Sequence, residues 1–189
     1  MRFKSRTFEE AHTVLALREL SVQLAGRPDI APILDRITLD IRAGETACLV
    51  GESGSGKSVT SLAVMGLLPP DALEVTNGGI RLGERDLRAI KQSALRNLRG
   101  RRMAMIFQEP MTALNPVMRV GDQIDEVLRT HTDLSPTDRE ARVLDMLDQV
   151  QLPDITRMFR SFPHQLSGGQ RQRIMIAMAL ALEPELLIA

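Results

Sequence analysis

A glycine-rich loop at Gly51–Ser58 constrains the fold of this chain more than any other feature. Its sequence, GESGSGKS, matches the phosphate-binding loop pattern without departure. The loop follows an apolar run, Thr46–Val50, that we expect to be a buried strand. It precedes a helix that we expect from Lys57 to about Leu68, ended by Pro69–Pro70. A strand, a glycine-rich loop and a helix in this order predict an α/β fold that binds a nucleotide.

Each residue type in this loop has a chemical role. Glycines let the backbone curl so that successive N–H groups face a phosphate, and the helix that begins there adds its positive end. Lys57 can reach the β- and γ-phosphates as a point charge, and the Ser58 hydroxyl can ligate Mg²⁺. The residues predicted to bind the phosphates are Gly51, Glu52, Ser53, Gly54, Ser55, Gly56, Lys57, Ser58 and Val59.

A second anion-binding helix start is predicted at the sequence LSGGQ. Ser167 can cap a helix that runs on through Leu182, and Gly168 and Gly169 leave its amide donors uncovered. The segment Ile174–Leu180 is apolar on every side, so we expect a buried and rigid helix. A rigid set of donors aimed at a γ-phosphate is what phosphoryl transfer requires.

Shorter patterns predict the elements around these two motifs. Val14–Leu24 and Ile33–Ile41 alternate apolar and polar residues, as half-buried strands do. Asn77–Gly79 is typical of a turn, and we expect a strand to follow it at Ile80–Leu82. Met103–Phe107 is expected to be a short buried strand.

Between these parts, two segments have the apolar period of amphipathic helices. Ser135 and Pro136 suit the cap and the first position of the second helix. A helical insert between two sheet-bearing parts is therefore predicted. Its apolar faces are Val120, Ile124, Val127 and Leu128 in the first helix, and Val143, Leu144, Leu147 and Val150 in the second.

Composition excludes some function classes. The 189 residues include 24 basic and 24 acidic side chains and only five aromatic ones, all Phe, which argues against nucleic acid as a partner. We interpret the arginines at positions 96, 99, 101 and 102 as a solvated face. The single cysteine, Cys48, excludes an internal disulfide, and we expect it to be a small buried core residue. We interpret His164, just before Leu166, as structural.

The ordered motifs resemble those of ABC-type ATPases. The glycine-rich loop, Gln108 in the sequence IFQEP, and LSGGQ followed by RQR match the phosphate loop, the Q-loop and the signature of that family. The residues around these motifs are similar to those of the ATPase subunits of dipeptide, oligopeptide, nickel and glutathione importers. The resemblance implies a P-loop NTPase (RecA-like) core with an antiparallel β subdomain and an inserted helical subdomain, incomplete at the C-terminus.

On this basis we divide the chain into a loose tail, 1–12, and one incomplete domain, 13–189. Within that domain, 13–110 would form the nucleotide-binding core and β subdomain, and 111–166 the helical subdomain. Residues 167–189 would form the signature helix and the strand Leu186–Ala189, after which the family places a magnesium-binding Asp and a catalytic Glu.

The same resemblance implies roles for named residues. Gln108 would contact Mg²⁺ or the attacking water, so Ser58 and Gln108 are the expected metal ligands. Ser167, Gly168, Gly169 and Gln170 would act in trans, on ATP held by the phosphate loop of a second ABC ATPase domain. The family commonly stacks adenine on an aromatic residue before the phosphate-loop strand, but here Ile33 offers only an apolar contact.

The implied function is ATP hydrolysis coupled to solute uptake. The partners would be a second ATPase domain, membrane permease subunits and, indirectly, a solute-binding protein, at the cytoplasmic face of the inner membrane. One alternative is a non-hydrolysing nucleotide-binding fragment, because without the Asp and Glu this exact chain is expected to hydrolyse ATP no faster than background. Another is a non-transport ABC protein, although the basic arms or long coiled coils typical of that class are absent from the sequence.

Overall fold

The structure, a computed structural model, describes residues 12–107 and 113–189. The chain divides into two compact units, Met1–Leu95 and Arg96–Ala189. The predicted boundary between the core and the helical subdomain, at residues 110 and 111, lies outside the described residues and stays a prediction.

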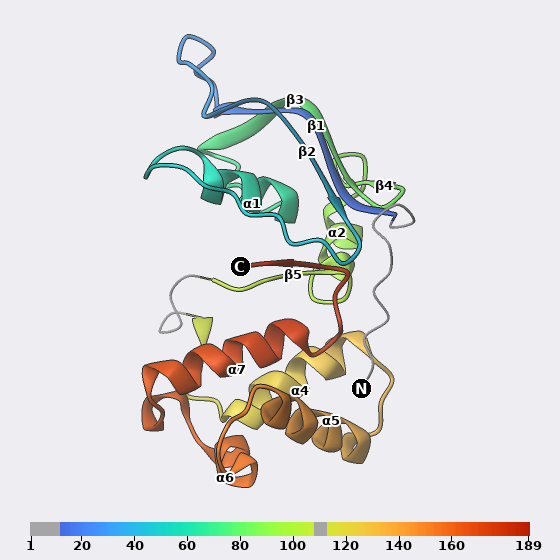
Figure 1. Cartoon of the computed structure of the whole chain (residues 1–189), viewed down its shortest axis with the longest axis vertical. Helices are drawn as coiled ribbons and strands as arrows, with labels where there is room; N and C mark the ends of the chain where they lie inside the picture. The colour runs from blue at the N-terminus through green and yellow to red at the C-terminus, as the bar shows by residue number, and fades with distance from the viewer. Residues whose placement is uncertain (1–11, 108–112) are drawn as a thin grey trace. The chain divides into compact units, whose positions relative to one another are not determined.

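The first unit contains a four-stranded antiparallel sheet with the order β2-β1-β3-β4 (Figure 1). Its strands are β1 (Thr13–Leu24), β2 (Leu34–Arg42), β3 (Leu73–Leu82) and β4 (Arg85–Asp86). The two strands predicted at Val14–Leu24 and Ile33–Ile41 are therefore confirmed. Leu17 and Leu20 in β1 and Leu82 in β3 are fully buried.

The turn predicted at Asn77–Gly79 is wrong, because these residues lie inside β3. Gly78 has a positive φ of 85°, and a Cβ there would come within 2.4 Å of the carbonyl oxygens of Arg18 and Glu19. The register between β1 and β3 shifts between Arg18 and Ser21. The glycine thus allows a β-bulge and a close approach of two backbones, not a chain reversal.

Helix α1 (Lys57–Met65) follows the glycine-rich loop as predicted, but it ends at a glycine and not at Pro69–Pro70. Gly66 has a φ of 63° and donates its N–H to the carbonyl of Ala63. The N–H of Leu67 donates to the carbonyl of Leu62 at 2.8 Å. This pair of bonds ends the helix in a Schellman motif. Pro69 and Pro70 therefore lie beyond the end of the helix and do not terminate it.

The strand predicted at Thr46–Val50 is also wrong. The segment has no regular secondary structure, and its side chains are exposed, with Val50 at 90%. Within residues 12–107 and 113–189, none of the paired strands has this run as a neighbour. An apolar run forms a strand only where another strand takes its backbone hydrogen bonds. For the same reason Cys48, expected in the core, is exposed.

The second unit is mainly helical and has its own apolar core. Its helices are α4 (Val120–His131), α5 (Pro136–Gln149), α6 (Ile155–Arg160), the 3-10 turn η2 (Pro163–Gln165) and α7 (Gly168–Leu180). Both predicted helices of the insert are confirmed. Ile124 and Val143 are fully buried, and Ser135 caps α5 by accepting from the N–H of Asp138. In the described part of the chain, no helix has the length and apolar character needed to cross a bilayer.

A short parallel pair of strands, β5 (Met103–Met105) and β6 (Leu186–Ile188), completes the second unit. Both were predicted, although β5 stops before Phe107, which is 48% exposed. Helix α2 (Gln92–Leu98) spans the boundary in the chain between the two units. Arg102 joins the starts of β5 and β6, since its carbonyl accepts from the N–H of Leu186.

Candidate functional site

The glycine-rich loop adopts a conformation that requires glycine at two positions. Gly54 and Gly56 have φ angles of 84° and 88°, in the left-handed region that side chains disfavour. Between them the N–H of Ser55 donates to the carbonyl of Glu52. The chain therefore closes into a tight loop immediately before α1, which is the arrangement that the sequence pattern predicted.

Lys57 lies across this loop. Its Nζ donates to the carbonyl oxygens of Gly51 and Glu52, each at 2.7 Å, and to Oγ of Ser55 at 3.3 Å. These bonds hold the ammonium group at the mouth of the loop, and the side chain stays partly open to solvent. A fixed positive charge beside uncovered loop amides is suited to phosphate oxygens.

The first turn of α1 is free to bind an anion. Its N-cap, Gly56, provides no side-chain acceptor, and the first turn carries no acidic residue. The amides at this end and the helix dipole therefore attract negative charge. Ser58 is exposed, and its hydroxyl makes no hydrogen bond to a described residue, so it remains available as an oxygen ligand, as Mg²⁺ coordination requires.

Two contacts that the sequence did not reveal fix the loop to the rest of the first unit. The hydroxyl of buried Thr60 donates to the carbonyl of Gly56 at 3.0 Å. On the other side, Gly56 lies against buried Leu34 and the carbonyl of Ile33. A threonine one helical turn after a glycine is a weak sequence signal for the first contact, and no local pattern signals the second.

Ile33, the predicted adenine contact, is half-buried beside this loop. Its N–H donates to the carbonyl of Val22 at 2.8 Å, which ties it to β1. The structure therefore brings Ile33 and the phosphate loop together, but its contact with a base stays a prediction.

The signature residues form the capped start of α7. Oγ of Ser167 accepts from the N–H of Gln170 at 3.3 Å, and Oε1 of Gln170 accepts from the N–H of Ser167 at 2.9 Å. This reciprocal pair is a capping box. The predicted cap is confirmed, and α7 ends at Leu180, two residues before the predicted Leu182.

Gly168 and Gly169 are exposed, and a Cβ at either position would meet no described atom within 4 Å. The glycines therefore leave the face of this helix start open. Behind them α7 is less buried than predicted, because Ile174 and Ala177 are buried whereas Ile176 and Leu180 are only partly covered. The helix is held from one side by the core of the second unit.

Two arginines that the sequence analysis did not single out fix the start of α7. Nε of Arg171 donates to the carbonyl of Pro163 at 2.8 Å. Nη1 of Arg173 donates to the carbonyls of Val150 and Gln151, at 2.9 and 2.8 Å, where α5 ends. A cation at the carbonyl end of a helix is favourable. The sequence RQR, which directly follows the signature, is the local signal that could have indicated these two arginines.

The remaining predicted residues have mixed outcomes. Gln108 lies outside the described residues, so its role stays a prediction. His164 is exposed and stacks on the ring of Phe162 at 5.7 Å between centroids. The described residues contain no group of His, Cys, Asp and Glu able to hold a metal.

The arginine cluster is not entirely a solvated face. Arg96 and Arg101 are exposed, but Arg102 donates to both carboxylate oxygens of Glu185, at 2.6 and 2.5 Å. These hydrogen bonds raise the pKa of Arg102 above its ordinary value. Burial lowers the pKa of Arg99, with a smaller contribution from Arg96.

The family model described as "ABC transporter" matches residues 34–189. The chain belongs to the ABC transporter family. Within this family, the chain is 46% identical over 176 residues to the dipeptide transport ATP-binding protein DppD of Bacillus subtilis, covering 93% of this chain and 52% of that protein. It is 41% identical over 177 residues to the oligopeptide transport ATP-binding protein AppD of the same species, covering 94% and 54%. The predicted resemblance to peptide-importer subunits is thus confirmed.

The chain spans about half the length of these curated relatives. Among solved structures, it is similar to the ATP-binding cassette MJ0796, described as dimeric and bound to ADP and Pi in a post-hydrolysis state, with a TM-score of 0.78 and 27% identity over 92% of this chain and 72% of that one. A second dimeric structure of that cassette gives a TM-score of 0.77. The predicted P-loop fold of ABC ATPases is therefore confirmed.

Proposed function

We propose that this chain is the nucleotide-binding part of an ABC importer ATPase, which couples ATP binding and hydrolysis to the uptake of dipeptides, oligopeptides or a similar solute. ATP would bind with its phosphates against Gly51–Val59. Mg²⁺, bound with it, would neutralise charge on the β- and γ-phosphates, and Ser58 and Gln108 would be its protein ligands.

One observation carries the nucleotide part of this proposal: the position of Lys57. Its ammonium group is held by two loop carbonyls, directly beside the uncapped first turn of α1. A lysine fixed at this place presents a charge to phosphates without first having to be ordered. Relatives named as dipeptide and oligopeptide transport ATP-binding proteins support the transported class.

The proposed partners follow from the family. Ser167 to Gln170 would close on ATP held by a second ATPase domain, and a cassette described as dimeric supports such pairing. A membrane permease, supplied by a solute-binding protein, would be contacted from the cytoplasmic face of the inner membrane through the segment of residues 111–150.

The nucleotide part is tested by calorimetry with ATP and Mg²⁺. Lys57→Ala should abolish detectable binding, because the charge at the β- and γ-phosphates is lost. Lys91→Ala is the matched control, since Lys91 is an exposed lysine outside the loop. Unchanged ATP affinity in Lys57→Ala would refute the assignment.

The permease part is tested by crosslinking in the complete transporter. Exposed Cys48 is first replaced by serine, because it would otherwise react. Single cysteines are then placed at exposed Glu126 in α4 and exposed Arg18 in β1. We expect crosslinks to permease loops from position 126 and none from position 18. The reverse pattern would contradict this docking site.

A further inference from the structure

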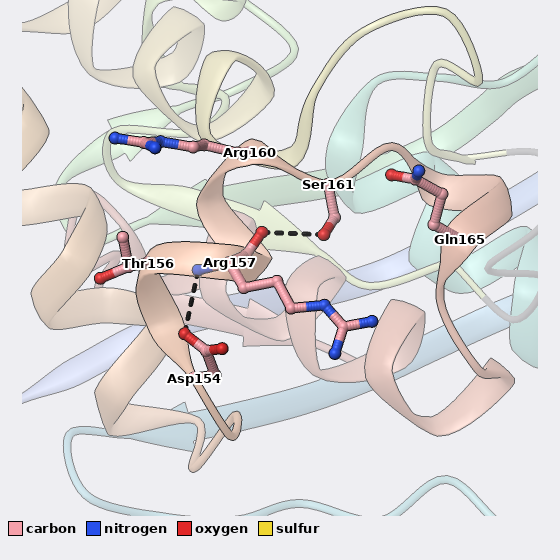
Figure 2. Close-up of a pocket in the computed structure, with 6 residues that line it drawn as sticks. All are labelled: Asp154, Thr156, Arg157, Arg160, Ser161 and Gln165. Carbon is pink, nitrogen blue, oxygen red and sulfur yellow. Dashed lines mark hydrogen bonds between the residues drawn. The ribbon is translucent and has the colours of Figure 1, made fainter.

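The second unit has a polar pocket of about 490 Å³ between α6 and the turn before the signature. Its lining residues are Asp154, Thr156, Arg157, Arg160, Ser161 and Gln165 (Figure 2). None of them belongs to the phosphate loop or the signature, and none is apolar.

Two arginines of the pocket, Arg157 and Arg160, lie on α6. Among the described residues, the guanidinium groups of Arg157 and Arg160 form no ion pair and no hydrogen bond. Other arginines of this unit are paired, such as Arg139 with Asp125 and Arg142 with Glu183. The pocket thus presents cationic donors that remain available to a ligand.

The other polar groups of the pocket are mostly committed to local structure. Asp154 accepts from the N–H of Arg157 as the cap of α6, and Ser161 donates to the carbonyl of Arg157. Oε1 of Gln165 accepts from the N–H of Phe162, so its NH₂ group remains as a further donor. Donors therefore outnumber free acceptors, which favours an anionic ligand.

We propose that this pocket binds an acidic segment of a partner protein through the carboxylates of that segment. Guanidinium groups match carboxylates with two parallel hydrogen bonds. Figure 2 shows Arg157 extending toward the side where Gln165 lies, whereas Arg160 leaves α6 in another direction. A single small anion would not contact both arginines, but a peptide with spaced carboxylates would.

The charge of the whole chain supports a local and specific site. The 24 basic and 24 acidic residues cancel, so an acidic partner is not attracted by the protein as a whole. Two arginines against one aspartate make the pocket locally positive. The site goes beyond the proposed function, because it needs no nucleotide and lies entirely within the second unit.

A bound segment would also act on the signature. Gln165 is followed directly by Leu166 and Ser167, and Leu166 is buried in the core of the unit. A ligand held by Arg157 and Gln165 would thus stabilise the turn from which α7 starts.

The test is fluorescence anisotropy with the full 189-residue chain and a short labelled peptide of alternating glutamate and glycine. The comparison peptide has glutamine in place of glutamate. We expect saturable binding of the acidic peptide alone, weakened roughly tenfold in the double variant Arg157→Ala/Arg160→Ala. The control is Arg129→Ala, at an exposed arginine of α4, which should bind as the parent chain does.

Three results would overturn the proposal: equal binding of the glutamine peptide, unchanged affinity in the double variant, or complete displacement of the peptide by inorganic phosphate at low millimolar concentration, which would indicate a small-anion site. Unfolding curves of all variants establish that they are folded. Because the assay contains no ATP, its failure leaves the Lys57 experiment untouched.

Discussion

Gly56 and Leu34 lie so close together that a side chain at position 56 would displace Leu34. A Cβ on Gly56 would lie 2.4 Å from Cδ2 of Leu34 and 3.2 Å from the carbonyl oxygen of Ile33. Leu34 is buried at the start of β2. The phosphate loop is therefore packed against the sheet at its last glycine, which fixes where α1 begins.

Two glycine variants separate this contact from backbone strain. Gly54→Ala and Gly56→Ala both force alanine into a positive φ, which destabilises by about 1–2 kcal/mol. A Cβ on Gly54 would meet no described atom within 4 Å, whereas a Cβ on Gly56 would collide with Leu34. We expect a larger loss of unfolding free energy in Gly56→Ala, measured by urea denaturation, because Leu34 must also move. Equal losses would show that the contact with Leu34 is unimportant.

The sequence predicted best those parts whose structure depends on local chemistry. The loop Gly51–Ser58, the cap at Ser167 and the cap at Ser135 all depend on residues close to one another along the chain, and all three form as predicted. The alternation in β2 was equally informative, because half-buried and exposed residues alternate from Ile37 to Arg42 with the period of two expected of a strand, whereas β1 is buried in runs of consecutive residues.

Predictions failed where the outcome depends on a distant segment. Thr46–Val50 has the composition of a strand, but none of the described strands pairs with it. Gly78 looks like part of a turn, yet it serves a bulge opposite Arg18. Arg173 was overlooked because its acceptors, at Val150 and Gln151, are more than twenty residues away. Local patterns carry no information on such partners.

The signature glycines should lower the free energy of unfolding, because glycine is unfavourable in a helix. They also leave the amides of the helix start uncovered. Gly169 lies in the first turn of α7 without a positive φ and with free space around it. Gly169→Ala should therefore raise the unfolding free energy by up to about 1 kcal/mol, while ATP turnover of the complete transporter falls. Gly26→Ala is the contrast, because Gly26 also has free space but a φ of 67°, so that variant should lose stability. A destabilised Gly169→Ala chain would contradict this explanation.

Arg173 should hold α7 against the end of α5. Arg173→Ala removes both bonds to the carbonyls of Val150 and Gln151 and should lower the unfolding free energy by about 1 kcal/mol. Arg173→Lys should restore part of the loss, because an ammonium group keeps the charge but not the planar donor geometry of the guanidinium group. The control is Gln172→Ala, at an exposed neighbour, which should change stability by less than about 0.5 kcal/mol. Identical effects at positions 172 and 173 would show that the bonds contribute nothing.

The ion pair between Asp125 and Arg139 should stabilise the packing of α4 on α5. Nε of Arg139 lies 2.6 Å from Oδ1 of Asp125, and both side chains are partly shielded from water, with Arg139 at 15% and Asp125 at 29% exposure. Fully exposed pairs contribute about 0.2–1 kcal/mol, and shielding reduces the screening by solvent and salt. We therefore expect Asp125→Asn to lower the unfolding free energy by about 1 kcal/mol. Glu126→Gln, at the exposed neighbouring position, should have little effect.

A double-mutant cycle tests whether this loss belongs to the pair. Asp125→Asn, Arg139→Gln and the double variant are unfolded in urea at low and at high salt. If the pair is responsible, the double variant loses less than the sum of the two single variants, and the coupling decreases only modestly with salt. Strictly additive losses would mean that each side chain acts through other contacts, for which Arg139 has one candidate, its bond to the carbonyl of Leu134 at 2.9 Å.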